Sequence, residues 1–95
     1  MLTGFEWDGA KATSNARKHR VTFEEAVTAF GDPMAITLDD PGYSEYERRF
    51  VTIGRSSRGR LLVACHCDRP DCVRIISSRM ANRRERSYYE STGKA

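Results

Sequence analysis

The middle of the chain is a run of short strand-like segments divided by tight turns. Turn-forming clusters such as Asp39-Asp40-Pro41-Gly42 fall between segments in which apolar side chains alternate with polar ones. Connections this short join antiparallel neighbours, because a parallel crossover needs about a dozen residues or more. The sequence therefore predicts a four-stranded antiparallel sheet, with strands over residues 34–38, 47–55, 60–67 and 72–77.

Helix signals lie on either side of these strands in the sequence. Asp8 is a typical N-cap for a helix over residues 9–19. Thr22 and Glu25 have the spacing of a capping box, which predicts a second helix over residues 23–30. A third helix follows the last strand. The order predicts an α+β fold with two N-terminal helices, the antiparallel sheet and a C-terminal helix, all helices packing on one face of the sheet.

Positive charge is concentrated in the second half of the chain. Residues 46–86 hold eleven arginines and four acidic side chains, whereas residues 1–45 hold four basic and eight acidic ones. Thirteen of the sixteen cations are arginines, whose planar guanidinium groups fit phosphate oxygens. The length of 95 residues is typical of one domain, expected over residues 1–95. The second half is therefore expected to face an anionic partner.

Membrane and metal functions are not indicated. The chain has no long apolar run and no signal-peptide pattern, so a cytoplasmic protein is expected. Cys65 and Cys67 would face one way on a strand and His66 the other, so they cannot converge with Cys72 on one zinc ion. Cys67 and Cys72 could form a hairpin disulfide under oxidation, but in a cytoplasmic protein we expect reduced thiols. No metal and no cofactor are expected.

The segment RIISSRMANRRERSYYE carries the clearest functional signal. On a helix, Arg79, Arg83 and Arg86 would line one side, with Glu85 and Tyr89 as neighbours on another. Guanidinium groups suit phosphates, and a tyrosine ring offers a face on which an unstacked base can lie. The alternative is a solvated amphipathic helix in which Glu85 pairs with a neighbouring arginine.

A second candidate group lies at the start of the second predicted strand. Glu47 and Arg49 share a strand face by alternation, with Arg48 on the other. An acid beside a guanidinium could hold a phosphate and take a proton. An ordinary cross-strand ion pair, worth less than about 1 kcal/mol if exposed, is the alternative.

His19 ends the first predicted helix, where the helix dipole favours its charged form. It could act as a general base or acid near neutral pH. However, Ala12, Ala16 and His19 recur at the spacing of a narrow buried stripe. A core histidine, or one that bonds the free carbonyls at the helix end, is therefore the alternative.

The chain resembles the BrnT family of toxins from type II toxin–antitoxin systems. The resemblance rests on FEWDGAKATSNARKHRVTFEEA, FGDP, ERRFVTIG, GRLLV and RIISSRMANRRERSYYE, and covers almost the whole chain. It implies a small ribonuclease with a fold akin to RelE-type toxins. It also implies a BrnA-like ribbon-helix-helix antitoxin, through which operator DNA would be bound, and free toxin that cuts RNA and stops translation and growth. Arg20 departs from the pattern, which has glycine after Lys-His.

Metal-free RNA cleavage uses the 2′-hydroxyl as nucleophile, and needs cations on the phosphate oxygens with groups that move protons. The residues expected to take part in catalysis are Arg49, Arg74, Arg79, Arg83, Glu47, Glu85, Tyr89 and His19. Those expected to bind RNA are Arg60, Arg84, Arg86, Tyr88 and Lys18. The sequence does not decide which residue is the general base or acid, and it leaves a homodimer open.

Three functions are compatible with these residues. The leading one is a ribonuclease toxin. The second is a non-catalytic RNA- or DNA-binding module that uses the same arginines. The third is an interaction protein whose basic surface is masked by an acidic partner, in which case charge reversal at Arg83 and Arg84 should abolish the complex.

Overall fold

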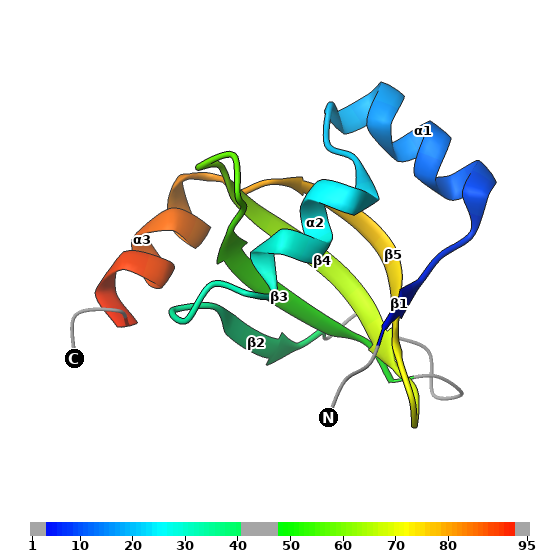
Figure 1. The fold of residues 1–95 in the computed structure, drawn as a ribbon. Helices are drawn as coiled ribbons and strands as arrows, with labels where there is room; N and C mark the ends of the chain where they lie inside the picture. The colour runs from blue at the N-terminus through cyan, green and yellow to red at the C-terminus, as the bar shows by residue number, and fades with distance from the viewer. Residues whose placement is uncertain (1–3, 41–47, 93–95) are drawn as a thin grey trace.

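A mixed β-sheet organises the computed structural model, which describes residues 4–40 and 48–92 (Figure 1). Within these ranges the chain forms three helices and five strands, which confirms the α+β class. No helix in the described ranges is both long and apolar enough to cross a membrane. The elements are β1 Phe5–Glu6, α1 Gly9–His19, α2 Phe23–Ala29, β2 Ile36–Asp39, β3 Phe50–Arg55, β4 Leu61–Asp68, β5 Val73–Met80 and α3 Arg83–Thr92.

The predicted four-stranded antiparallel sheet is wrong at one edge. The strand order is β1-β5-β4-β3-β2, and β1 pairs with β5 in parallel, with Phe5 opposite Val73 and Glu6 opposite Arg74. The other neighbouring strands are antiparallel, as predicted. A two-residue strand leaves no alternating pattern to read, and its partner lies far along the chain, so the sequence carries no local signal for this pairing.

The helices cover both faces of the sheet, which corrects the prediction of a single covered face. Leu62 and Ala64 of β4 pack with residues of α2, whereas Leu61 and Val63 pack with Tyr89 of α3. Because side chains alternate along a strand, these two sets lie on opposite faces. Burial on both sides explains why this strand reads as a continuous apolar run.

Local capping chemistry fixes the ends of the first two helices as predicted. The side chain of Asp8 accepts a hydrogen bond from the Lys11 amide at 2.9 Å, and Thr22 accepts one from the Glu25 amide at 3.0 Å. Arg20 closes α1 in the left-handed conformation, with φ of 59°. This is the position where the family resemblance leads one to expect glycine, the residue that adopts positive φ without strain.

Asn15 is the residue that attaches α1 to the open edge of β5. Its side-chain amide donates to the Ser78 carbonyl at 2.8 Å and to the Val21 carbonyl at 3.0 Å, and it accepts from the Ser78 amide at 3.0 Å. The Asn15 side chain thus supplies hydrogen-bond partners for both backbone groups of Ser78, as a neighbouring strand would. Asn15 is buried, whereas His19, expected in a buried stripe, is half-buried.

Replacement of Asn15 by alanine is expected to lower the free energy of unfolding by about 3 kcal/mol, because both backbone groups of Ser78 lose their partner in a buried place. Urea unfolding at neutral pH measures the effect. Thr13→Ala, an exposed change on the same helix, should stay within about 0.5 kcal/mol of the unchanged protein. Equal stability of the two variants would contradict this role for Asn15.

Candidate active site

Three of the predicted arginines lie on the sheet face that α3 partly covers. Arg79 lies opposite Val63, and Arg74 lies opposite Cys67 on the same strand pair. Arg49 directly precedes β3. Its positive charge lowers the pKa of the Cys65 thiol, against the larger effect of burial, and Cys65 lies on this face. We call the surface formed by Arg49, Arg74 and Arg79 the arginine face.

A β-bulge brings Arg74 and Arg79 to the same face. Residues five apart on a regular strand point in opposite directions. Here the register shifts, so that Cys65 lies opposite Ser77 and His66 opposite Ile75. The extra residue in β5 resets the alternation. Strand alternation alone would have separated these two arginines.

Arg79 is held by a carboxylate from α3. Its two terminal nitrogens donate to the two oxygens of Glu85, each at 2.8 Å. Glu85 also accepts from the Asn82 amide at 2.9 Å, and its own amide donates to the Asn82 side chain at 2.8 Å, which makes a capping box for α3. The Arg79 guanidinium lowers the pKa of Glu85. This carboxylate is therefore an anchor for Arg79 and a weak proton acceptor.

This arrangement corrects the predicted place of Arg79. The sequence places Arg79, Arg83 and Arg86 on one side of a helix, but β5 continues to Met80, which pairs with Leu62, and α3 begins at Arg83. The strand continues because β4 extends beside it as far as Leu61, whose carbonyl accepts from the Ala81 amide at 2.9 Å, and Asn82 then caps the helix. Arg83 is exposed and Arg86 is half-buried on α3.

The other two members of the arginine face differ in their partners. Arg74 donates to Glu6 at 3.0 Å, and the same Glu6 oxygen lies 3.5 Å from Arg69. The hydrogen bond from Arg74 is the main reason that the pKa of Glu6 is lowered. The Nε of Arg49, in contrast, is buried without a hydrogen-bond partner among the described residues.

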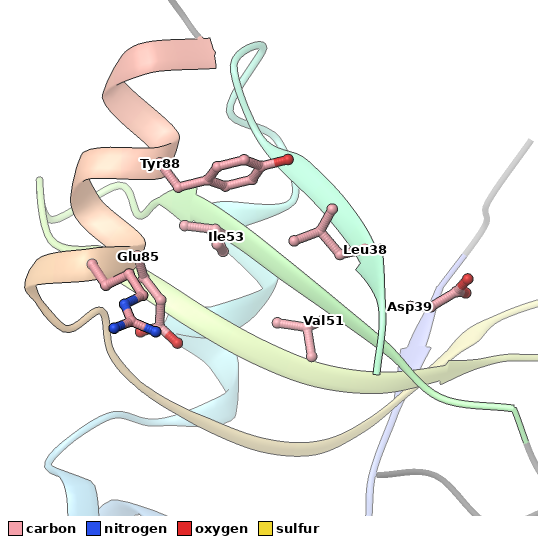
Figure 2. A pocket seen from close by; sticks show the side chains of 7 residues that line it. Leu38, Asp39, Val51, Ile53, Glu85 and Tyr88 are labelled. Carbon is pink, nitrogen blue, oxygen red and sulfur yellow. The ribbon is translucent and has the colours of Figure 1, made fainter. Parts of the chain in front are cut away.

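A groove of about 360 Å³ lies between α3 and the strands β2 and β3 (Figure 2). Its floor is apolar, and Tyr88, Arg84 and Glu85 from α3 form its wall. Figure 2 shows the Tyr88 ring beside this floor, while the Asp39 carboxylate points away. The lining residues are Leu38, Asp39, Val51, Ile53, Arg84, Glu85 and Tyr88.

Tyr89 points into the protein instead of the groove. It is buried, its hydroxyl donates to Asp32 at 2.5 Å, and the Arg55 guanidinium lies 5.8 Å from its ring centre. The Asp32 carboxylate raises the pKa of the Tyr89 hydroxyl. Of the two tyrosines of α3, Tyr88, which is 43% exposed, is therefore the one that can offer a ring face to a base.

Arg60 lies in a separate cluster with α2. Its Nε donates to the buried Glu25 at 2.9 Å, its Nη2 makes an ion pair with the same carboxylate, and it also donates to the Arg20 carbonyl at 3.0 Å. The Ser56 hydroxyl donates to Glu25 at 2.7 Å. Hydrogen bonds from Arg60 are the first cause of the lowered pKa of Glu25. Three of the five N–H groups of Arg60 are therefore directed at the protein.

Lys18 and His19 lie at a second, smaller pocket between α1 and β5, of about 210 Å³. Its lining residues are Lys11, Ser14, Asn15, Lys18, His19, Ile76 and Ser77. Lys11 was not among the site residues predicted from the sequence. The recurrence of Lys11, Ser14 and Lys18 at three- and four-residue steps was the signal that could have found it. Glu47, the remaining predicted residue, lies outside the described residues.

The Cys-His-Cys segment of β4 lies mostly inside the protein, with His66 and Cys67 buried and Cys65 half-buried. His66 is buried between the Thr52 hydroxyl and the Asp68 carboxylate, each at 2.8 Å, and burial lowers its pKa. The Cys65 thiol donates to Asp40 at 3.5 Å, and burial raises its pKa to about 11. In residues 4–40 and 48–92, no three or more His, Cys, Asp or Glu side chains are grouped so as to hold a metal ion.

Both the sequence and the fold are similar to those of known proteins. A family model described as "Ribonuclease toxin, BrnT, of type II toxin-antitoxin system" matches residues 7–85. The comparison with curated proteins gives no match. Among solved structures, the chain is similar to the crystal structure of the Brucella abortus ribonuclease toxin BrnT, with a TM-score of 0.58 and 19% identity. The match covers 87% of this chain and 100% of that one, and it shows a shared fold.

Replacement of Glu25 by glutamine is expected to lower the free energy of unfolding by about 2 kcal/mol at neutral pH, because Arg60 loses its buried counter-ion. A lowered folded-state pKa adds stability above the unfolded carboxyl value of about 4.3, and this stability is lost as pH falls through the folded-state pKa. The difference from the unchanged protein should therefore shrink in acid. Urea unfolding as a function of pH measures it, with the exposed neighbour change Glu24→Gln as control. A difference that does not depend on pH would refute the ion-pair account.

Proposed function

This chain belongs to the BrnT family, the ribonuclease toxins of type II toxin–antitoxin systems, and we propose that the arginine face is where it cleaves RNA. The observation that carries the proposal is the placement of Arg79. It is held in two-point contact by Glu85 on the same face as Arg49 and Arg74. Oriented guanidinium groups on one surface are what a phosphodiester in its transition state needs.

Arg79 retains donors after it has bound Glu85. A guanidinium has five N–H groups, and three are directed at Glu85 and the Met80 carbonyl. The remaining two are available for phosphate oxygens. In the proposed reaction, the 2′-hydroxyl oxygen gives up its proton to water and attacks the adjacent phosphorus, the bond to the 5′-oxygen breaks, and that oxygen takes up a proton from water, which leaves a 2′,3′-cyclic phosphate. Arg79 with Arg49 stabilises the negative charge that develops on the phosphate.

We assign Glu85 and Tyr89 to positioning. Both already serve partners inside the protein, Arg79 for Glu85 and Asp32 for Tyr89. Tyr88 takes the role of base contact, because its exposed ring borders the groove beside Arg84. A base stacked on such a ring gains about 1–3 kcal/mol without regard to sequence. Arg83 and Arg86 extend the cationic surface along α3.

Family membership supports further proposals about the biology. A type II toxin has an antitoxin partner, and we propose that it is a BrnA-like ribbon-helix-helix protein through which operator DNA is bound. Cleavage proceeds without a metal ion and stops translation and growth in the cytoplasm. The single domain over residues 1–95 would have a fold akin to RelE-type toxins.

Replacement of Arg79 by glutamine is expected to reduce the rate of RNA cleavage in EDTA by about 100-fold, because one charge-stabilising donor is removed. Multiple-turnover assays on single-stranded RNA measure the rate, and thermal unfolding verifies the fold. Arg58→Gln removes the same charge from a 70% exposed side chain and should leave the rate unchanged. Retained activity in folded Arg79→Gln would exclude the arginine face. RNA binding without product from the unchanged protein would favour a non-catalytic binding module.

Replacement of Glu85 by glutamine separates an anchor from a general base. For an anchor, the replacement is expected to lower kcat by about tenfold, because Arg79 loses the group that orients it. The dependence of kcat/KM on pH should then stay the same. A carboxylate base would instead impose a loss of activity in acid that disappears in the variant. The pH profile of kcat/KM for both proteins decides between the two roles.

A further inference from the structure

The pocket between α1 and β5 carries basic side chains that all come from the half of the chain whose net charge is negative. Lys11, Lys18 and His19 come from one side of α1, and Ile76 and Ser77 come from the exposed part of the β5 edge. In Figure 1, α1 lies beside β5 and away from α3. Of the acidic residues of this half, Glu25 is buried at Arg60, Asp39 pairs with Arg48, and Asp8 caps α1 by accepting from the Lys11 amide.

The cations at this pocket have no counter-ion among the described residues. Within that part of the chain, the side chains of Lys11, Lys18 and His19 make no hydrogen bond or ion pair. Arg74 and Arg79, in contrast, are each paired with a glutamate. Positive charges around a concave surface attract an anion, and the Ser14 and Ser77 hydroxyls can donate to its oxygens.

Ser77 connects this pocket to the arginine face. It lies opposite Cys65, two residues before Arg79, and it also lines the pocket. Two residues along a strand span about 7 Å. Ile76, the bulge residue without a partner on β4, also lines the pocket, so one nucleic-acid strand could pass from the arginine face across the edge of the sheet to α1.

We propose that the α1–β5 pocket binds a phosphate of the RNA substrate other than the scissile one. The inference rests on the proposed ribonuclease function and extends its substrate path. Lys11 and Lys18 neutralise the phosphate, and Ser14 and His19 donate hydrogen bonds to it. The site binds RNA independently of base identity, since every lining donor addresses an anion.

The test compares two double variants that each remove two charges from the α1 region. Lys11→Gln with Lys18→Gln empties the pocket of lysines, whereas Arg17→Gln with Arg20→Gln removes charges that do not line it. The probe is a single-stranded 2′-O-methyl RNA, which lacks the nucleophile and stays intact. The pocket variant is expected to bind about three- to tenfold more weakly than the control. The slope of log K against log salt concentration should be smaller in magnitude for the pocket variant, by about 0.7 for each phosphate that is no longer neutralised.

Cleavage of unmodified RNA supplies the second readout. In the pocket variant KM should rise while kcat is kept, since the scissile phosphate is bound elsewhere. Equal affinities and salt slopes for the two double variants would overturn the phosphate site, even if the unchanged protein cleaves RNA. Failure of the unchanged protein to cleave RNA would instead refute the ribonuclease proposal. Weaker binding of an acidic protein partner with unaltered RNA affinity would show that the pocket serves a protein and would also overturn the inference.

Discussion

The bulge between β4 and β5 determines what this protein can present to a ligand. One extra residue in β5 changes which side chains share a face. Before it, Ile75 packs into the core under α2, and Arg74 reaches Glu6 on the other side. After it, the Ser78 amide donates to the Asn15 side chain, and Arg79 donates to Glu85. Without this residue, the two arginines would lie on opposite faces and the arginine face would not exist.

Ionic pairing divides the cations into two groups with different uses. Arg60, Arg74 and Arg79 are oriented by carboxylates, and Arg60 mainly secures the buried Glu25. Lys11 and Lys18 bring charge to a pocket without a carboxylate partner among the described residues. The concentration of arginine in the second half predicts an anion-binding surface, but composition cannot tell which charges are already neutralised. That depends on contacts between residues far apart in the sequence.

Local chemistry was readable from the sequence, and long-range contacts were not. Asp8 and Thr22 act within one turn of helix, so their capping roles follow from spacing alone. The parallel pairing of β1 and the burial of Asn15 involve partners more than sixty residues away. Adjacent tyrosines show the same limit: only the packing of α3 sets Tyr89 on Asp32 and leaves Tyr88 at the groove.

Orientation and attraction place opposite demands on a cationic site. A guanidinium that stabilises a developing charge must be fixed in advance, and the nearest fixing group is a carboxylate that weakens its field. Arg79 meets the first demand through Glu85 and the Asn82 cap. Capture of a polyanion needs charge that no carboxylate offsets, which acts over about 10 Å at moderate salt. Lys11 and Lys18 supply it across the edge of the same strand. A short β5 edge, left open by the two-residue β1, is therefore what allows both demands to be met within so small a domain.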